Sequence, residues 1–495
     1  MRRWRDIHPC SAARWRRGIR CSPVRANAGA WHVPLSRSRR NGRRWRVARA
    51  CAGRGAAAGA ASRGLGTPVR GRAGSVAAHR GGRGGSPVRR NGRVPLRRAR
   101  RWPVPDALEC KRDERAYLMA TLCRPAISVP EHVITMEETL DLARTIHADH
   151  PQLALALRLM ENTGVQKRHL LRPIEETLRH DGFEIRNRIY ETEAKARVPA
   201  VIERALKDAD LRAQDIDVII YVSCTGFMMP SLTAWLINTM GFRGDTRQIP
   251  IAQLGCAAGG AAINRAHDFC TAYPEANALI VACEFCSLCY QPTDLGVGNL
   301  LSNGLFGDGI AAAVMRGEGG TGVSLERNGS YLVPETEDWI AYDVRSTGFH
   351  FKLDKRVPGT MEPLAPALKE LAGQHGWDAS DLDFYIIHAG GPRILDDLST
   401  FLGVPAEAFR FSRATLTEYG NIASAVVLDA LRRMFDEGSA HPTARGLLAG
   451  FGPGITAEMS LGRWTVSDRA SERLGTRVIK EVPDRVLVEE SSRVG

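Results

Sequence analysis

The chain reads Ile249-Pro-Ile-Ala-Gln-Leu-Gly-Cys-Ala-Ala-Gly-Gly-Ala-Ala-Ile-Asn264 at its most informative point. This pattern predicts a strand, a tight turn with Cys256 at its tip, and a helix of small residues. A thiol at a helix N-terminus lies at the positive end of the helix dipole, which favours the thiolate and nucleophilic attack. The glycines let the backbone approach a substrate closely. An ordinary buried cysteine fits the same pattern, so both interpretations stay open on this stretch alone.

Helical and strand patterns alternate around this stretch. We predict amphipathic helices at 135–147 and 191–206. Predicted strands, each followed by a small-residue turn and then a helical pattern, lie at 217–222, 248–254, 278–283, 310–315 and 384–388. Short apolar strands are typical of a sheet that is covered on both faces. The sequence therefore predicts an α/β fold.

Two polar residues downstream are candidate partners for the thiol. His388 ends the apolar strand of Asp383-Phe-Tyr-Ile-Ile-His-Ala-Gly-Gly391, and strand ends are where α/β proteins present active groups. Asn421, in Leu416-Thr-Glu-Tyr-Gly-Asn-Ile-Ala-Ser-Ala425, is predicted to begin a helix. A histidine at a sheet edge and an asparagine that only caps a helix are structural alternatives for these two positions.

The three residues occur together with two glycine-containing motifs, Leu305-Phe-Gly-Asp-Gly309 and Gly450-Phe-Gly-Pro-Gly454. In order and spacing the set resembles the chalcone and stilbene synthase family of type III polyketide synthases. The resemblance covers essentially all of 119–495. It implies a homodimer whose subunits each have a tunnel for coenzyme A and a buried cavity in which the growing chain stays attached to cysteine.

The resemblance also implies the domain organisation. It predicts a thiolase-like layered αβαβα fold of two similar halves. The N-terminal half, 119–318, would carry the nucleophilic cysteine, and the C-terminal half, 319–495, would carry the histidine and the asparagine.

By position in the family, Cys256 is the nucleophile and acyl anchor, and His388 with Asn421 forms the oxyanion hole. The chemistry agrees, because decarboxylation of a malonyl thioester produces an enolate that needs hydrogen-bond donors at its oxygen. His388 can also hold the thiolate of Cys256 in an ion pair. The spacing of Cys283, Cys286 and Cys289 lacks the nearby fourth ligand of a closed metal site. No metal or other cofactor is expected.

The runs 221–236 and 286–294 resemble a bacterial subgroup of the family whose members make tetrahydroxynaphthalene. The resemblance assigns several residues to the cavity: Phe306 and Phe351 as gatekeeping aromatics, Cys224 as a second cavity cysteine, Cys286 and Cys289 in the cavity wall, Met229 reaching toward the partner's cavity across a dimer interface, Tyr342 beside the starter pocket, and Gly450, Phe451, Gly452, Pro453 and Gly454 at the cavity floor. A plain core role remains the alternative for the two aromatics.

Tyr342 stands where plant members of the family have a small residue. A bulkier, more polar lining favours a small acidic starter, so we predict malonyl-CoA as both starter and extender, with a linear pentaketide that cyclises to a naphthalene. Three basic residues, Lys167, Arg168 and Arg172, lie where the family contacts coenzyme A phosphates. A charged, solvated face is the alternative for these three.

The positive charge is concentrated at the N-terminus. Residues 1–118 carry 31 of the 68 Lys and Arg residues but only 5 of the 54 Asp and Glu residues. This Arg- and Gly-rich leader is predicted to be disordered, because it has too few apolar residues to offset the entropy of ordering. It could be a nucleic-acid or membrane tail, an organelle transit peptide, or translated upstream sequence. The abrupt start of patterned sequence at Met119 favours the last interpretation.

The remaining composition limits the setting. The eleven cysteines form no regular framework, which predicts a reducing, cytoplasmic location without disulfides. No apolar run reaches the length of about eighteen residues that a membrane helix requires. We therefore expect malonyl-CoA and a second copy as partners, and neither nucleic acid nor membrane. The rival hypotheses are a type III synthase with another acyl-CoA starter, a ketoacyl synthase of the initiating type that acts on an acyl carrier protein, and a nucleic-acid-binding protein driven by the leader.

Overall fold

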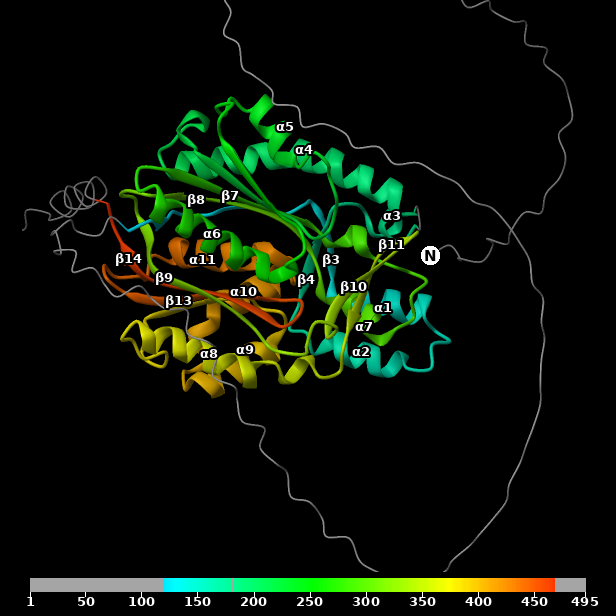
Figure 1. Cartoon of the computed structure of the whole chain (residues 1–495). Helices are drawn as coiled ribbons and strands as arrows, with labels where there is room; N and C mark the ends of the chain where they lie inside the picture. Colours follow the sequence, from blue (N-terminus) through cyan, green and yellow to red (C-terminus); the bar gives the residue numbers. More distant parts are fainter. Residues whose placement is uncertain (1–118, 180–181, 468–495) are drawn as a thin grey trace, which may run out of the picture. The chain divides into compact units, whose positions relative to one another are not determined.

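The computed structural model describes residues 119–179 and 182–467 (Figure 1), so the predicted leader lies outside the described residues. All described residues belong to one compact unit. The strands are β1 Thr121–Leu122, β2 Ala126–Ser128, β3 His132–Thr135, β4 Lys167–Leu170, β5 Val218–Val222, β6 Arg247–Ile251, β7 Asn277–Phe285, β8 Asp308–Arg316, β9 Gly322–Leu332, β10 Ile340–Arg345, β11 Gly348–Leu353, β12 Phe384–Ile387, β13 Arg445–Gly452 and β14 Thr456–Thr465. The α-helices are α1 Met136–Ile146, α2 Leu153–Glu161, α3 Ile174–Thr177, α4 Gly182–Asp208, α5 Leu232–Thr239, α6 Ala258–Ala272, α7 Val297–Leu305, α8 Met361–Gln374, α9 Pro392–Leu402, α10 Arg410–Tyr419 and α11 Val426–Glu437.

One large sheet runs through the described unit in the order β12-β13-β14-β9-β1-β8-β7-β5-β6, with β2 paired to β8. The short strand β1 joins the two halves, because Thr121 lies opposite both Arg316 of β8 and Ser324 of β9. Each half repeats one pattern of pairing. A parallel pair, β5 with β7 or β12 with β13, is followed by an antiparallel partner, β8 or β14.

The two halves of the sheet lie in separate layers. Figure 1 shows α6 and α11 between them, α4 and α5 outside the first half, and α8 and α9 outside the second. This arrangement confirms the predicted layered αβαβα fold. The predicted boundary at 318/319 falls in the turn between β8 and β9 and stays a prediction.

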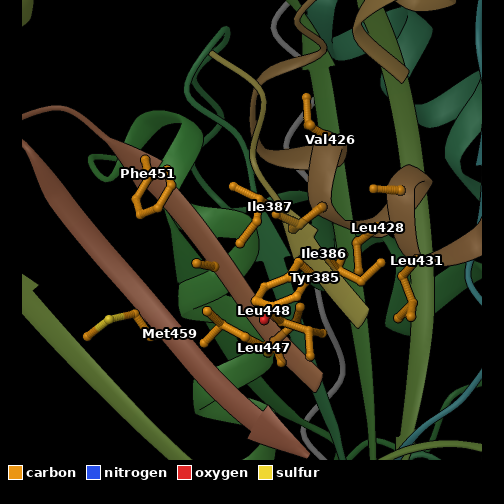
Figure 2. Packing of buried hydrophobic residues seen from close by; sticks show 14 of the residues in the cluster. Tyr385, Ile386, Ile387, Val426, Leu428, Leu431, Leu447, Leu448, Phe451 and Met459 are labelled. Carbon is orange, nitrogen blue, oxygen red and sulfur yellow. The ribbon is translucent and has the colours of Figure 1, made fainter. Parts of the chain in front are cut away.

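The core of the second half explains why its strands are apolar on both faces. Figure 2 shows residues 385–387 of β12 and 447–448 of β13 packed beside residues 426, 428 and 431 of α11. All of these side chains are at most 2% exposed. Since helices cover both faces of this layer, alternate side chains along a strand have no solvent-facing side, and the strand reads as a continuous apolar run. Phe451 belongs to the same cluster but lies near the end of β13.

The predicted helix at 135–147 is confirmed as α1, which begins with a capping box. Glu138 N donates to Thr135 Oγ1 at 3.2 Å, and Thr135 N donates to Glu138 Oε2 at 2.8 Å. These bonds satisfy backbone donors that the first turn of a helix leaves free.

Other predicted boundaries need correction. The helix predicted at 191–206 is the later part of α4, which begins at Gly182 and whose polar first turns are stabilised by tertiary contacts such as that of buried Arg186 with Leu288 O. The strand predicted at 248–254 ends at Ile251. The helix expected after 310–315 was wrong, because β8 turns directly into strand β9. Within the described residues, no helix has the length and hydrophobicity to cross a membrane.

Candidate active site

Cys256 lies in a 3-10 turn, Gly255–Ala257, between β6 and the first turn of α6, as its flanking sequence predicted. Two glycines permit this turn to approach the end of β13. Gly255 has a φ of +50°, and a Cβ there would meet Pro453 Cδ at 2.6 Å. At Gly452, a Cβ would meet the backbone nitrogen of Ala257 at 2.5 Å. Side chains at either position would displace the turn that carries the thiol.

His388 directly follows β12 and is held there by its backbone, whose N–H donates to Ala449 O at 2.8 Å. Its side chain is buried, and its Nδ1 atom has no hydrogen-bond partner. The strand end that the sequence predicted therefore delivers this imidazole to the interior.

Asn421 does not begin a helix, which corrects the prediction. It lies in an extended segment that bridges to Phe306, and its N–H donates to Leu305 O at 2.9 Å. A 3-10 turn, Ala423–Ala425, separates it from α11. Its side chain nevertheless caps that turn, because Oδ1 accepts a hydrogen bond from Ala423 N at 2.9 Å.

The three predicted residues meet at one place. His388 Nε2 lies 3.3 Å from Asn421 Oδ1. Because Ala423 N–H binds the same oxygen, the amide orientation of Asn421 is set and its NH₂ group is directed elsewhere. The Asn421 side chain also forms a hydrogen bond with the thiol of Cys256 that lowers the pKa of this cysteine. An amide donor therefore lies beside the sulfur atom, and the imidazole contacts that amide in the same cavity.

Burial governs the charge state of this group. It raises the pKa of Cys256 to about 12, an effect increased by the negative charge of Glu284 and opposed by the hydrogen bond from Asn421. Burial also lowers the pKa of His388 to about 4. Both shifts favour a neutral thiol beside a neutral imidazole, and they act against the thiolate that the helix dipole predicts. A nucleophilic thiolate here requires a nearby proton acceptor.

A cavity of about 470 Å³ surrounds the three residues. Predicted positions that line it together with them are Cys224, Cys286, Phe306, Tyr342, Phe351, Phe451, Gly452 and Pro453. The ring centroids of Phe306 and Phe351 lie 5.4 Å apart in an edge-to-face arrangement, and those of Tyr342 and Phe351 lie 5.9 Å apart. These three rings form a continuous aromatic wall on one side of the cavity.

Three predicted cavity positions lie elsewhere. Cys289 lines a neighbouring cavity of about 70 Å³, which shares Phe306, Tyr342 and Phe351 with the larger one. Gly450 packs against α6 behind the site, where a Cβ would meet Ala257 O at 3.0 Å.

The third is Gly454, which lies near Leu332 and does not line the cavity. Met229 is 85% exposed, and its predicted approach to a partner's cavity stays a prediction. Of the predicted floor loop, only Phe451, Gly452 and Pro453 line the cavity.

The three predicted coenzyme A contacts do not form one exposed group. Lys167 is exposed, but Arg168 is buried, because adjacent residues of a strand point to opposite faces. The Arg168 guanidinium donates to Phe306 O at 3.1 Å and faces the smaller cavity. Arg172 pairs with Glu193 at 3.1 Å. The sequence missed Arg393, an exposed cation that lines the larger cavity at the start of α9.

Two buried carboxyl groups near the site were also missed. Glu284 accepts hydrogen bonds from Cys224 N at 3.1 Å and Thr225 Oγ1 at 2.9 Å, and from Ser424 Oγ, and burial raises its pKa to about 7. Burial likewise raises the pKa of Asp308 to about 6. A charged residue within an otherwise apolar strand, as in β7 and β8, is the signal that could have identified both.

The spacing of Cys283, Cys286 and Cys289 brings no metal site together. Across residues 119–179 and 182–467, no cluster of three or more His, Cys, Asp or Glu side chains could hold a metal ion. Burial raises the pKa of the Cys283 thiol above its usual range, and the hydroxyls of Tyr221 and Tyr190 are its hydrogen-bond neighbours.

Comparisons with known proteins agree with this geometry. Residues 325–464 match the model of the C-terminal domain of chalcone and stilbene synthases, and residues 108–322 match the model of FAE1/type III polyketide synthase-like proteins. The 1,3,6,8-tetrahydroxynaphthalene synthase of Streptomyces coelicolor is 83% identical over 71% of this chain and 94% of its own length. The enzyme of the same name from Streptomyces griseus is 69% identical over 74% of this chain and 98% of its own length.

A solved structure gives the same result. The crystal structure of the tetrahydroxynaphthalene synthase of Streptomyces coelicolor A3(2), described as a bacterial type III polyketide synthase, matches 70% of this chain and 100% of its own with a TM-score of 0.70. The cysteine, histidine and asparagine that converge in the cavity, the layered fold and these matches lead to one conclusion. The chain belongs to the chalcone and stilbene synthase family of type III polyketide synthases.

Proposed function

We propose that this protein is a 1,3,6,8-tetrahydroxynaphthalene synthase that uses malonyl-CoA as both starter and extender. The observation that carries the proposal is the meeting of Cys256, His388 and Asn421 in one cavity of about 470 Å³, in a chain 83% identical to a synthase of that name. The cavity walls are largely apolar and aromatic, which suits a substrate that must be kept from water.

In the loading step, the Cys256 sulfur attacks the thioester carbonyl of malonyl-CoA. The thiol proton passes to His388, a bond forms between sulfur and the carbonyl carbon, and the bond to the coenzyme A sulfur breaks. His388 returns the proton to the departing thiolate. This route uses the neutral thiol and neutral imidazole that burial favours, since the proton moves only when substrate is in place.

In the extension step, a second malonyl-CoA loses carbon dioxide, and the electrons of the broken bond form an enolate. Two donors, the NH₂ group of Asn421 and the N–H of the neutral His388 imidazole, stabilise the negative oxygen. The enolate carbon attacks the thioester on Cys256, a carbon–carbon bond forms, and the thiolate leaves. The lengthened chain then returns from coenzyme A to Cys256 for the next cycle. Side chains supply every step, so we propose no metal and no other cofactor.

The starter assignment rests on the aromatic wall. Tyr342 contacts Phe351 and narrows the cavity where a bulky starter would lie. We further propose that coenzyme A enters beside Arg393, the cation that lines the cavity. A homodimer would cover Met229 and Phe227, which are 85% and 54% exposed.

The test is to incubate the full-length protein with malonyl-CoA alone and to identify the products by mass spectrometry. Tetrahydroxynaphthalene or its oxidation product is the expected result. Product only after addition of another acyl-CoA would replace the proposed starter, and product only with an acyl carrier protein would favour a ketoacyl synthase.

Two cysteine variants complete the test. Cys256→Ala should abolish condensation. Cys270→Ala is the matched control, because Cys270 is a buried cysteine of α6, the helix that follows the Cys256 turn, and does not line the cavity. Repeated turnover by the first variant, or equal loss in both, would contradict the assignment of Cys256 as the nucleophile.

A further inference from the structure

We infer that His350 and Asp294 form a clamp that sets the position of the β10–β11 hairpin, and through it the starter and chain-length specificity of the cavity. The specificity part of this inference rests on the proposed function. The hairpin carries Tyr342 and Phe351, two of the three rings in the aromatic wall.

The hairpin has little backbone support. Among the described residues, β10 and β11 pair only with each other and are not joined to the large sheet. A two-stranded sheet alone is at best marginally stable in water. Side-chain contacts must therefore decide where its cavity-facing residues lie.

One face of the hairpin lines the cavity, and the other packs against the rest of the protein. Tyr342 lies opposite Phe351 in the pairing register, and the next pair along is Asp343 with His350. Successive residues of a strand point to opposite faces, so His350 points away from the cavity while Phe351 points into it. His350 is 5% exposed although it is polar, which places its ring against other parts of the protein.

Both nitrogens of the His350 ring are bound. Nδ1 lies 2.9 Å from Asp294 Oδ2, and Nε2 lies 2.6 Å from Thr347 Oγ1. A carboxylate only accepts hydrogen bonds, so Nδ1 is the donor to Asp294. Burial raises the pKa of Asp294, but the hydrogen bonds from His350 and from the N–H of Gly296, together with the nearby charges of His350 and Arg345, outweigh burial and lower this pKa overall.

Asp294 is itself anchored to α7. Its Oδ1 atom accepts from Gly296 N at 3.1 Å, and its backbone oxygen accepts from Asn299 Nδ2 at 2.8 Å. Gln291, in the same loop, donates to Thr347 O and Phe349 O, both at 3.2 Å. The loop before α7 therefore holds the hairpin through two side chains: Asp294 binds the His350 ring, and Gln291 binds two backbone oxygens of the hairpin.

The far end of α7 completes the argument. Helix α7 leads directly into Phe306, whose ring meets Phe351 edge to face. At Gly298 the helix passes so close to β11 that a Cβ would lie 3.2 Å from Leu353 Cβ. One helix thus touches the hairpin at the clamp and at the aromatic wall, and Figure 1 shows α7 among the elements around β10 and β11. His350 does not line the cavity, so it acts on substrate only through the positions of Tyr342 and Phe351. His350 is therefore a positioning residue.

The first experiment measures the clamp without any substrate. Hydrogen exchange of the full-length His350→Ala protein should speed up by about tenfold in 340–353, because a hydrogen bond to a charged group is lost. Asp294→Ala should have the same effect. The double variant should exchange no faster in 340–353 than either single variant, since the two residues act as a unit. Lys352→Gln is the control, because it removes an exposed ion pair with Asp343 on the same hairpin. Unchanged exchange in His350→Ala would overturn the clamp even if the proposed function is wrong.

The second experiment measures product length and starter specificity. With malonyl-CoA alone, His350→Ala should release a larger share of shorter polyketides than the unsubstituted protein, and with added hexanoyl-CoA it should accept this starter several-fold better. His350→Gln, which keeps a donor, should restore part of the original product ratio. Faster exchange with an unchanged product ratio would confine the clamp to stability and overturn its role in specificity. If the unsubstituted protein makes no naphthalene, the proposed function fails, while the exchange result still decides the clamp.

Discussion

The imidazole Nε2 of His388 lies 3.3 Å from Oδ1 of Asn421, and a backbone N–H holds the same oxygen. This contact joins the end of β12 to the segment before α11 and sets the direction of the amide NH₂ group. A donor that is oriented before substrate arrives needs no reorganisation as charge develops, which is the main electrostatic advantage of an enzyme site over water.

Loss of this donor should slow the reaction severely. Asn421→Ala is expected to reduce kcat by about 10²- to 10³-fold, the usual effect of removing one oxyanion donor. Product formation from malonyl-CoA measures it. Asn328→Ala serves as the control, because Asn328 is a partly buried amide that binds Asn264 O and Asp268 and does not line the cavity. A similar loss in both variants would indicate general damage and would remove the special role of Asn421.

The reactivity of Cys256 should depend on His388. Burial raises the pKa of Cys256 to about 12, so a nearby proton acceptor is needed for the thiolate to form at neutral pH. In His388→Gln the rate of alkylation by iodoacetamide should fall at pH 7, and its rise with pH should move to higher pH. Alkylation followed by peptide mass spectrometry reports Cys256 separately from the other cysteines. An unshifted pH profile would show that His388 takes no part in removing the thiol proton.

Glu284 should act in the opposite direction. Its negative charge raises the pKa of Cys256, so Glu284→Gln should lower that pKa and move the alkylation profile to lower pH. Because the pKa of Glu284 is raised to about 7 by burial, the carboxylate is present above pH 7 and protonated below it. The two proteins should therefore differ most above pH 7 and converge below it.

A second buried glutamate provides the control for this charge effect. Glu458 binds Asn264 and Ser330 away from the cavity, so Glu458→Gln should leave the profile of Cys256 in place. A shift toward higher pH in Glu284→Gln would contradict the electrostatic argument.

The close approach of β13 to the cysteine turn should make Gly452 intolerant of a side chain. A Cβ at this position would lie 2.5 Å from the nitrogen of Ala257, and backbone cannot move aside cheaply. Gly452→Ala should lower Tm by several degrees, as overpacking costs about 1–3 kcal/mol, and should also lower kcat. Thermal unfolding and product assays measure the two effects.

Gly373→Ala is the matched control for this substitution. Gly373 lies within α8, where an added Cβ would have no neighbouring atom within 4 Å, and the helix gains propensity from alanine. The Tm of this variant should therefore stay level or rise. Equal Tm values for both variants would mean that the turn at Cys256 moves to accommodate the added Cβ without loss of stability.

Much of the fold was predictable because its signals are local. The apolar runs at 217–222 and 278–283 became β5 and β7, and the capping residues Thr135 and Glu138 marked the start of α1. The failures share a cause. The first turns of α4 and the hairpin after β8 depend on partners that are distant in sequence, and a local pattern carries no information about them.

The candidate site divides in the same way. Cys256, His388 and Asn421 were identified because each stands in a distinctive stretch, and their combination was more specific than any one of them. Arg393 was missed because nothing in its immediate neighbours indicates that it lines the cavity, whereas Glu284 and Asp308 had a local signal, a charged residue within an otherwise apolar strand. Arg168 was placed on the surface because spacing alone does not tell which face of β4 is covered.

The sequence by itself determined which residue types stand at strand ends and turns, since backbone preference and apolar periodicity act over a few neighbours. It thereby determined an α/β fold, and the resemblance of its combined motifs to a known family added the layered arrangement and the three residues of the site. Only the tertiary structure decided the charge state of these residues, because burial and a distant carboxyl group shift the pKa of Cys256 in the direction opposite to the helix dipole. It also decided the position of the aromatic wall, because the β10–β11 hairpin has no place in the large sheet and depends on contacts such as that of His350 with Asp294.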